Sequence, residues 1–401
     1  MKFQYTVLLA VSLAAAVSAE AADTAPRTVN PAELIAVLQS DAPKSDKAKA
    51  FKPLAVFGDK NAVPAIAPYL SDEELSSWAR IALEAIPDPA CDEALRKAEA
   101  GLKGRLLIGV INSIGVRRDA RSVDALVVRL GDPDAAVATA AAAALGRIRG
   151  DAAAKALEQA LATAVPAVRG EVADAVVRCA EKNLAEGKND EAIRLYDLVS
   201  KADVPPNRVL EGVRGAIAAR GKAGLPLLVE LLKSTDRKRF ALSLKMTREN
   251  PAPELTDALL AELGRAAPAR QSLLLMALAD RNDPKAREAL LRGAKSGVGD
   301  ARIASIRGLK KVGDRSCGPV LVDAALDDNA DISEAAAEVL ADLPAKEIDD
   351  LLVARLPSAS GKSRGVLIDL VGRRHIESVA PVLLKLADDP DAQVRMAAQS
   401  R

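Results

Sequence analysis

A unit of about 31 residues recurs along most of this chain, and this period limits the possible folds more than any other feature. In the clearest copy a first helix is predicted over residues 121–130, because its apolar residues follow the i, i+3, i+4, i+7 spacing of one helical face. These residues are Val123, Leu126, Val127 and Leu130. A second apolar stripe, from Val137 to Ile148, predicts a partner helix after a polar turn. Helix pairs that repeat at one spacing stack on their neighbours, so the sequence predicts an all-α solenoid.

Comparable first helices are expected to begin near Pro31, Asn61, Cys91, Arg121, Asp151, Asn189, Lys222, Pro253, Lys285, Ser316, Glu347 and Glu377. We therefore predict about twelve antiparallel helix pairs over residues 31–401. The step from Asp151 to Asn189 is longer than the others, and it leads into a segment similar to a tetratricopeptide-type helix. An irregular joint is therefore predicted near residues 165–205.

The turns inside the pairs carry signals for the start of the second helix. Asp132 is expected to accept hydrogen bonds from free N–H groups of that helix, and Pro133 fits its first position because proline has no donor to satisfy there. Ser71 and Glu74 have the spacing of a capping box, in which both side chains accept from free backbone donors. These signals predict that the second helices begin directly after these residues.

The second helices share a sequence pattern. The copies are VATAAAAALG at 137–146, ARIASIRGLK at 301–310 and WARIALEAI at 78–86. They resemble the pattern Val-Arg-x-x-Ala-x-x-Ala-Leu-Gly of HEAT-like repeats of the bilin-lyase type, in the form found in exported bacterial proteins. The resemblance covers most of residues 31–401 and implies a HEAT-like superhelix.

The resemblance also implies roles for individual residues. In this family the arginine of the pattern supports a ladder of aspartates between repeats, which implies that role for Arg302 and Arg395. Ala138 is then a gap in the ladder. Trp78 aligns with Val137, a core position, so we expect its side chain to pack between helices.

The first residues have the features of a secretory signal peptide over residues 1–19. Lys2 precedes an apolar run over residues 7–17, and small residues favour cleavage after Ala19. The run is about half of the ~20 residues that a membrane-spanning helix needs, and no cysteine follows it to carry a lipid. We therefore expect an exported, periplasmic or extracellular protein with residues 20–30 as a linker and no membrane span after cleavage.

Composition argues against several classes of partner. The chain has 56 basic and 55 acidic residues, and loss of Lys2 with the leader makes these numbers equal, which gives no support for nucleic-acid binding. Only 2% of residues are aromatic, so no small-molecule pocket is inferred. Cys91, Cys179 and Cys317 are about three or more repeats apart, much farther than a disulfide can reach, and we expect three free thiols.

No catalytic, cofactor-binding or metal-binding residue is predicted. His375 is the only histidine, and common zinc and iron sites need several His or Cys ligands. The segment SASGKSRG lacks the earlier glycine and the preceding strand of a phosphate-binding loop. Close approach of helices is the expected reason for the glycines in the segment GLKGRLLIGVINSIG. These are Gly101, Gly104, Gly109 and Gly115.

Charged residues fall into two kinds of turn. The acidic turns lie inside pairs, at 71–74, 131–135, 327–331 and 387–391, whereas the basic run at 236–239 departs from this pattern. The basic turns lie between pairs and contain Arg117, Arg118, Arg147, Arg149, Lys310, Lys311, Arg315, Arg373 and Arg374. Acids at helix starts and bases at helix ends complement the helix dipole by about 0.3 to 1 kcal/mol each, which favours a structural role. A partner-binding edge is the alternative.

These observations predict a non-catalytic protein-interaction scaffold of the cell envelope or exterior that binds a protein partner along its surface. The alternative is the accessory helical part of a larger secreted enzyme, carbohydrate-processing or haem-binding, with its catalytic domain beyond Arg401. The last predicted helix ends one residue before the counterpart of Leu145, which is a core position. We therefore expect an incomplete last repeat and a longer native protein.

Overall fold

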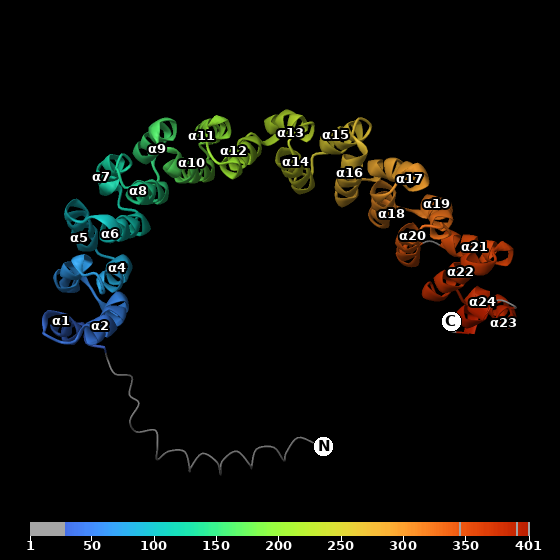
Figure 1. Ribbon diagram of the computed structural model, residues 1–401, viewed down its shortest axis with the longest axis horizontal. Coiled ribbons are helices and arrows are strands. Elements are labelled where there is room, and N and C mark those ends of the chain that lie inside the picture. The colour runs from blue at the N-terminus through green and yellow to red at the C-terminus, as the bar shows by residue number, and fades with distance from the viewer. Residues whose placement is uncertain (1–28, 345, 390–391, 400–401) are drawn as a thin grey trace, which may run out of the picture. The chain divides into compact units, whose positions relative to one another are not determined.

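The computed structural model describes residues 29–344, 346–389 and 392–399, and these residues form 24 α-helices and no strand. The helices follow one another as twelve pairs, each joined by a short turn (Figure 1). The first helices of the pairs begin close to the positions predicted from the period, so the prediction of about twelve helix pairs is confirmed. The predicted signal peptide over residues 1–19 lies outside the described residues.

The chain divides into two compact units, Met1–Gly215 and Ala216–Arg401. The odd-numbered helices of the first unit are α1 (Pro31–Gln39), α3 (Val63–Ile66), α5 (Pro89–Gly101), α7 (Val123–Arg129), α9 (Asp151–Thr163) and α11 (Asn189–Lys201). The even-numbered helices are α2 (Lys44–Phe57), α4 (Ser76–Ala85), α6 (Gly104–Arg117), α8 (Ala135–Ile148), α10 (Pro166–Ala185) and α12 (Pro206–Ala219). The boundary between the units lies within α12.

The second unit continues the same order. Its odd-numbered helices are α13 (Leu225–Leu232), α15 (Glu254–Leu263), α17 (Arg287–Ser296), α19 (Gly318–Ala325), α21 (Lys346–Arg355) and α23 (Ala380–Leu386). Its even-numbered helices are α14 (Arg237–Glu249), α16 (Pro268–Asp280), α18 (Asp300–Val312), α20 (Ala330–Asp342), α22 (Gly361–Arg373) and α24 (Ala392–Gln399). Short 3-10 turns introduce several of the odd-numbered helices.

Each unit has two layers of helices. In the first unit α4, α6, α8 and α10 pack on one another in order, and in the second unit α14, α16, α18 and α20 do the same. We call these helices the even layer, and their odd-numbered partners the odd layer. The core lies between the layers and repeats with the period of the sequence. Its fully buried positions include Leu83, Ile114, Leu145 and Val176 in the first unit, and Leu278, Leu309, Leu340 and Val371 in the second.

Close backbone contacts hold neighbouring helices of the even layer together. A Cβ atom on Gly115 of α6 would lie 2.8 Å from Cα of Ala144 on α8, and one on Gly109 would lie 2.8 Å from Nε of Arg80. The predicted reason for these two glycines is confirmed. The same prediction is wrong for Gly101 and Gly104, because a Cβ atom on either glycine would have no other atom within 4 Å. Gly104 instead has a φ of +52° at the start of α6, a conformation that glycine adopts without strain.

Both predicted helix starts are wrong by a few residues. The cap of α8 is Asp134, whose side chain accepts from the N–H of Ala136 at 2.9 Å, whereas Asp132 accepts from the N–H of Asp134 within the turn. The hydroxyl of Ser71 donates to Pro68, and Asp72 accepts from the N–H groups of residues 74 and 75 before α4 begins at Ser76. In both turns an extra aspartate satisfies donors of the turn, so the helix starts later.

The prediction that Trp78 is buried is also wrong, because its side chain is 40% exposed. The core position that corresponds to Val137 is Leu75, directly before α4 and three residues before Trp78, and it is 3% exposed. The buried face of α4 continues through Ala79 and Leu83, and α6 packs against it. Trp78 therefore lies outside this buried face of α4, with a large part of its surface open to solvent.

The three cysteines are buried free thiols, as predicted. Burial raises the pKa of each, and it raises the pKa of the Cys179 thiol to about 11. Thiols with raised pKa values are almost fully protonated at neutral pH, so they pack as small apolar side chains. Within the predicted joint, α10 has 20 residues, whereas α8 has 14.

Candidate protein-binding surface

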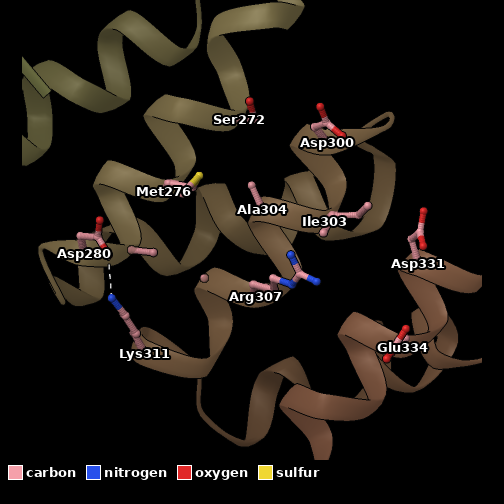
Figure 2. A pocket seen from close by; sticks show the side chains of 12 residues that line it. Ser272, Met276, Asp280, Asp300, Ile303, Ala304, Arg307, Lys311, Asp331 and Glu334 are labelled. Atoms are coloured by element: carbon pink, nitrogen blue, oxygen red, sulfur yellow. Dashed lines mark hydrogen bonds and ion pairs between the residues drawn. The ribbon is translucent and has the colours of Figure 1, made fainter. Parts of the chain in front are cut away.

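The even layer of the second unit contains a groove of about 580 Å³ between α16, α18 and α20 (Figure 2). Met276, Ala304 and Ile303 supply apolar atoms, and Figure 2 shows Met276 and Ala304 close to the centre of the groove. Met276 is 48% exposed, and Leu273, one turn earlier on the same helix, is 41% exposed. On α14, α16, α18 and α20, all of which the structure describes, these two are the exposed large apolar side chains.

The period of the sequence explains why these side chains face the same way. Residues about 31 positions apart occupy equivalent places on successive helices of the even layer. Met276 of α16 is thus followed by Arg307 of α18 and Glu338 of α20, and all three are exposed. The equivalent residue on α14 is the exposed Lys245. One face of the second unit therefore presents a row whose chemistry changes from helix to helix.

Ion pairs lie at and beside one end of the groove. The Lys311 ammonium lies 2.6 Å from the Asp280 carboxylate (Figure 2). The same carboxylate lies 2.8 Å from Nε of Arg248. Lys310 forms a further pair with Asp342 at 2.6 Å. These charges neutralise one another across neighbouring helices, so they are part of the scaffold.

Charged groups elsewhere along the groove have no ion pair among the described residues. They are Asp300 and Arg307 on α18 and Asp331 and Glu334 on α20. All four are exposed, and Figure 2 shows them on the walls of the groove. Their charges are therefore available to a partner.

A second set of charges is structural. Arg117 ends α6, and its guanidinium donates to the Leu83 and Ile86 carbonyls at the end of α4, both at 2.7 Å, and pairs with Asp92. The hydrogen bond to Asp92 is the main reason that the pKa of Arg117 is raised. Arg374 repeats this arrangement, with its Nε 2.6 Å from Asp349. These arginines cap the preceding helix of the even layer.

Arg281 has the same role with neutral partners. Its guanidinium donates to the carbonyls of Thr247, Asn250 (2.7 Å) and Ala252 (2.6 Å), and to the hydroxyl of Thr256 (2.9 Å). Burial lowers its pKa. The basic turns therefore contain buried helix caps, which supports the structural interpretation of these charges.

Arg302 occupies the ladder position that the family resemblance implied. Its guanidinium lies 2.8 Å from Asp327 in the next turn, and Arg364 makes the same kind of contact with Asp389 at 2.6 Å. Arg395 donates to the main-chain carbonyl of Asp389 at 2.7 Å. Ala138 on α8 is buried and contributes no charge, so the ladder is interrupted there.

The other sequence motifs lie outside the groove. His375 is exposed in the turn after α22, with a φ of +53°. The segment around Gly361 follows α21 and a 3-10 turn. Among the described residues, no three His, Cys, Asp or Glu side chains are placed to hold a metal ion together. Over the same residues, no helix is long and apolar enough to cross a membrane.

Sequence reasoning did not find the groove. Its lining residues come from three helices about 30 positions apart, and none of them forms a recognisable motif. A signal was present in the exposed residues of each even-numbered helix once they are aligned by the period. Met276 is apolar at a place where the equivalent residues Arg307 and Glu338 are charged.

Stacked helix pairs with a core that repeats at constant spacing define an all-α solenoid. A family model for HEAT repeats matches residues 104–176 and 256–341. The chain therefore contains HEAT-like repeats. No curated protein sequence matches it.

Two solved structures have a similar fold. One is Kap95p, whose binding induces the switch loops of RanGDP to adopt the GTP-bound conformation. It matches 93% of this chain and 60% of its own length, at 13% sequence identity and a TM-score of 0.51. Kap121p matches 92% of this chain and 48% of its own length, at 11% identity and a TM-score of 0.51. The chain thus covers less than two thirds of either protein, and identities this low establish a shared fold alone.

Proposed function

We propose that this chain is a non-catalytic protein-interaction scaffold and that the groove between α16, α18 and α20 binds its partner. The exposure of Leu273 and Met276 beside the unpaired charges is the observation that carries this proposal. A patch of apolar side chains rimmed by polar groups is typical of protein-binding sites. Full burial of an exposed methionine or leucine side chain contributes about 1.5 to 3 kcal/mol, and covering the roughly half of Leu273 and Met276 that is exposed contributes about half of that for each. The charges around them select the partner.

The fold supports the same proposal. HEAT-like arrays leave long rows of side chains free along stacked helices, which suits an extended partner. Kap95p, whose fold is similar, binds the protein RanGDP. In this proposal the array holds a partner and does not itself catalyse a reaction.

A photo-crosslinking experiment tests the proposed surface. A benzophenone amino acid is placed at position 276 or, as a control, at Val128, which is 74% exposed on α7 of the odd layer. In cells that express each variant, we expect a discrete protein adduct from position 276 and none from position 128. Loss of that adduct on Leu273→Glu would support the groove. Equal adducts from both positions, or none from 276, would contradict the proposal.

We also propose that the protein is exported. The charged lead, the apolar run over residues 7–17 and the small residues that end at Ala19 support this. Expression of the full chain in a bacterium, followed by mass spectrometry of the purified protein, gives the mature N-terminus. We expect it at Glu20, and a chain that retains Met1 would show that the leader is not cleaved.

A further inference from the structure

The exposed face of the even layer in the second unit changes its charge in a fixed order. On α14 the exposed residues Arg237, Lys238 and Lys245 are basic, and the Asp236 carboxylate before them caps the helix by accepting from the N–H of Arg239 at 2.8 Å. Lys245 is held only loosely, 3.9 Å from Glu249. This helix therefore presents positive charge to solvent.

The face of α20 is acidic. Asp331, Glu334 and Glu338 follow one another on one side of the helix, all are exposed, and none has an ion pair among the described residues. Asp300 adds a further exposed carboxylate at the start of α18. Within the described part of the chain, Arg307 is the one unpaired base that lines the groove, so negative charge dominates its α18–α20 side.

Between the two charged faces lies α16, with Leu273 and Met276 exposed and Asp280 neutralised by Lys311 and Arg248. The groove begins at α16 and continues to α20, so it runs across the helices. On α18 the exposed charges of Asp300 and Arg307 offset each other. The order along these helices is therefore basic on α14, apolar on α16 and acidic on α20. We call α14, α16, α18 and α20 the polar track.

We infer that the partner segment held by the polar track is a peptide with acidic residues at one end, one or two large apolar residues in the middle, and basic residues at the other end. This inference rests on the proposed function and specifies its partner. Opposite charges at both ends fix the orientation of such a peptide, and the apolar side chain enters the groove beside Met276. A peptide with its charges interleaved would place like charges together at one end or the other.

The distance along the track sets the length of the segment. Three steps separate α14 from α20, and neighbouring packed helices lie about 9 Å apart, so the track is about 27 Å long. An extended peptide advances about 3.3 Å per residue and therefore needs about eight residues to cover it. The apolar residue lies about three positions from the acidic end, because α16 is one step from α14.

Fluorescence anisotropy with synthetic peptides tests the inference on the purified chain. Peptide one has aspartates at one end, leucines about a third of the way along, and lysines at the other end. Peptide two has the same composition with aspartates and lysines interleaved and leucines at both ends. We expect at least ten-fold tighter binding of peptide one, which weakens as salt is added because the contacts are exposed.

Charge reversal in the protein gives the matched test. The double variant Glu334→Lys, Glu338→Lys should bind peptide one at least ten-fold more weakly, and a peptide with aspartates at both ends should bind that variant at least ten-fold more tightly than peptide one does. The control is Glu288→Lys on α17, whose side chain is 84% exposed on the odd layer, and it should leave the binding of peptide one unchanged.

Two outcomes would overturn the inference: equal binding of peptides one and two, or unchanged binding of peptide one after reversal on α20. Either could occur while a crosslinked adduct still forms at position 276. In that case the proposed scaffold function would be supported, and only the inferred charge order of the partner peptide would be wrong. Absence of an adduct would instead count against the function itself.

Discussion

At the scale of single residues, the most informative side chains are the arginines that end helices of the even layer. Arg117 and Arg374 are nearly buried, with 9% and 7% of their side chains exposed, and both contact backbone carbonyls of the preceding even-numbered helix. The last carbonyls of a helix have no partner within it, so each arginine satisfies groups that would otherwise be buried without hydrogen bonds. One residue thereby joins two repeats.

Arg281→Ala should lower the free energy of unfolding by about 2 to 4 kcal/mol, because it leaves several buried carbonyls at the end of α14 without donors. Urea unfolding followed by circular dichroism measures this. The control Arg292→Ala removes an exposed i,i+4 pair with Glu288 and should cost less than about 0.5 kcal/mol. Equal losses in the two variants would show that Arg281 is not a structural cap.

At the scale of helices, the spacing of the even layer depends on residues without bulky side chains. A Cβ atom on Gly146 of α8 would lie 2.8 Å from both Cα and Cβ of Ala175 on α10. In the same way, a Cβ atom on Gly308 of α18 would lie 3.0 Å from Cβ of Ala279 on α16. Alanine and glycine at these contacts let neighbouring helices approach closely, which explains the high alanine content of α8.

Two glycine substitutions should therefore have opposite effects. Gly146→Ala inserts a methyl group into a closed contact and should cost about 1 to 3 kcal/mol. Gly101→Ala, at the exposed end of α5 with no atom within 4 Å, should stabilise the protein by up to about 0.5 kcal/mol because alanine favours helix. Thermal unfolding of both variants measures the difference. If Gly146→Ala were as stable as the wild type, the helices of the even layer could move apart without cost.

At the scale of the whole molecule, aspartates before helices recur in both units and link stability to pH. The hydrogen bond from the N–H of Lys285 lowers the pKa of Asp283, that from the Ser316 hydroxyl lowers the pKa of Asp314, and that from the N–H of Asn329 lowers the pKa of Asp327. In each case the folded state favours the charged carboxylate. Stability from these groups is therefore fully present above the unfolded-state pKa of about 3.8 and is lost as the pH falls through the lower folded-state values.

We expect the urea midpoint to stay nearly constant from pH 7 to pH 5 and to fall steeply below about pH 4. Unfolding curves at several pH values measure this. Asp314→Asn keeps a side-chain acceptor but cannot titrate, so it should reduce the size of the acid-induced loss. A wild-type midpoint that does not fall below pH 4 would contradict a role for these aspartates.

The sequence by itself determined the class of fold, the number of helix pairs and the state of the cysteines. These features depend on the period of the apolar residues, which is a local property that every repeat restates. Because the period occurs about twelve times, an error in one copy does not change the result. The prediction that Cys91, Cys179 and Cys317 are free thiols depends on the same period, because the period places them several repeats apart.

Only the tertiary structure decided which side chains remain exposed. Trp78 and Met276 lie on amphipathic helices, and their exposure depends on where the neighbouring helices pack, which the pattern of one helix does not contain. The helix α4 begins later than the capping signal predicted, because Asp72 accepts hydrogen bonds from the N–H groups of residues 74 and 75 in the preceding turn. The groove required α16, α18 and α20 to be placed side by side, since its apolar centre and its acidic wall come from different repeats. The groove combines side chains from neighbouring repeats that pack together, whereas the sequence period specifies only which positions of each repeat are apolar.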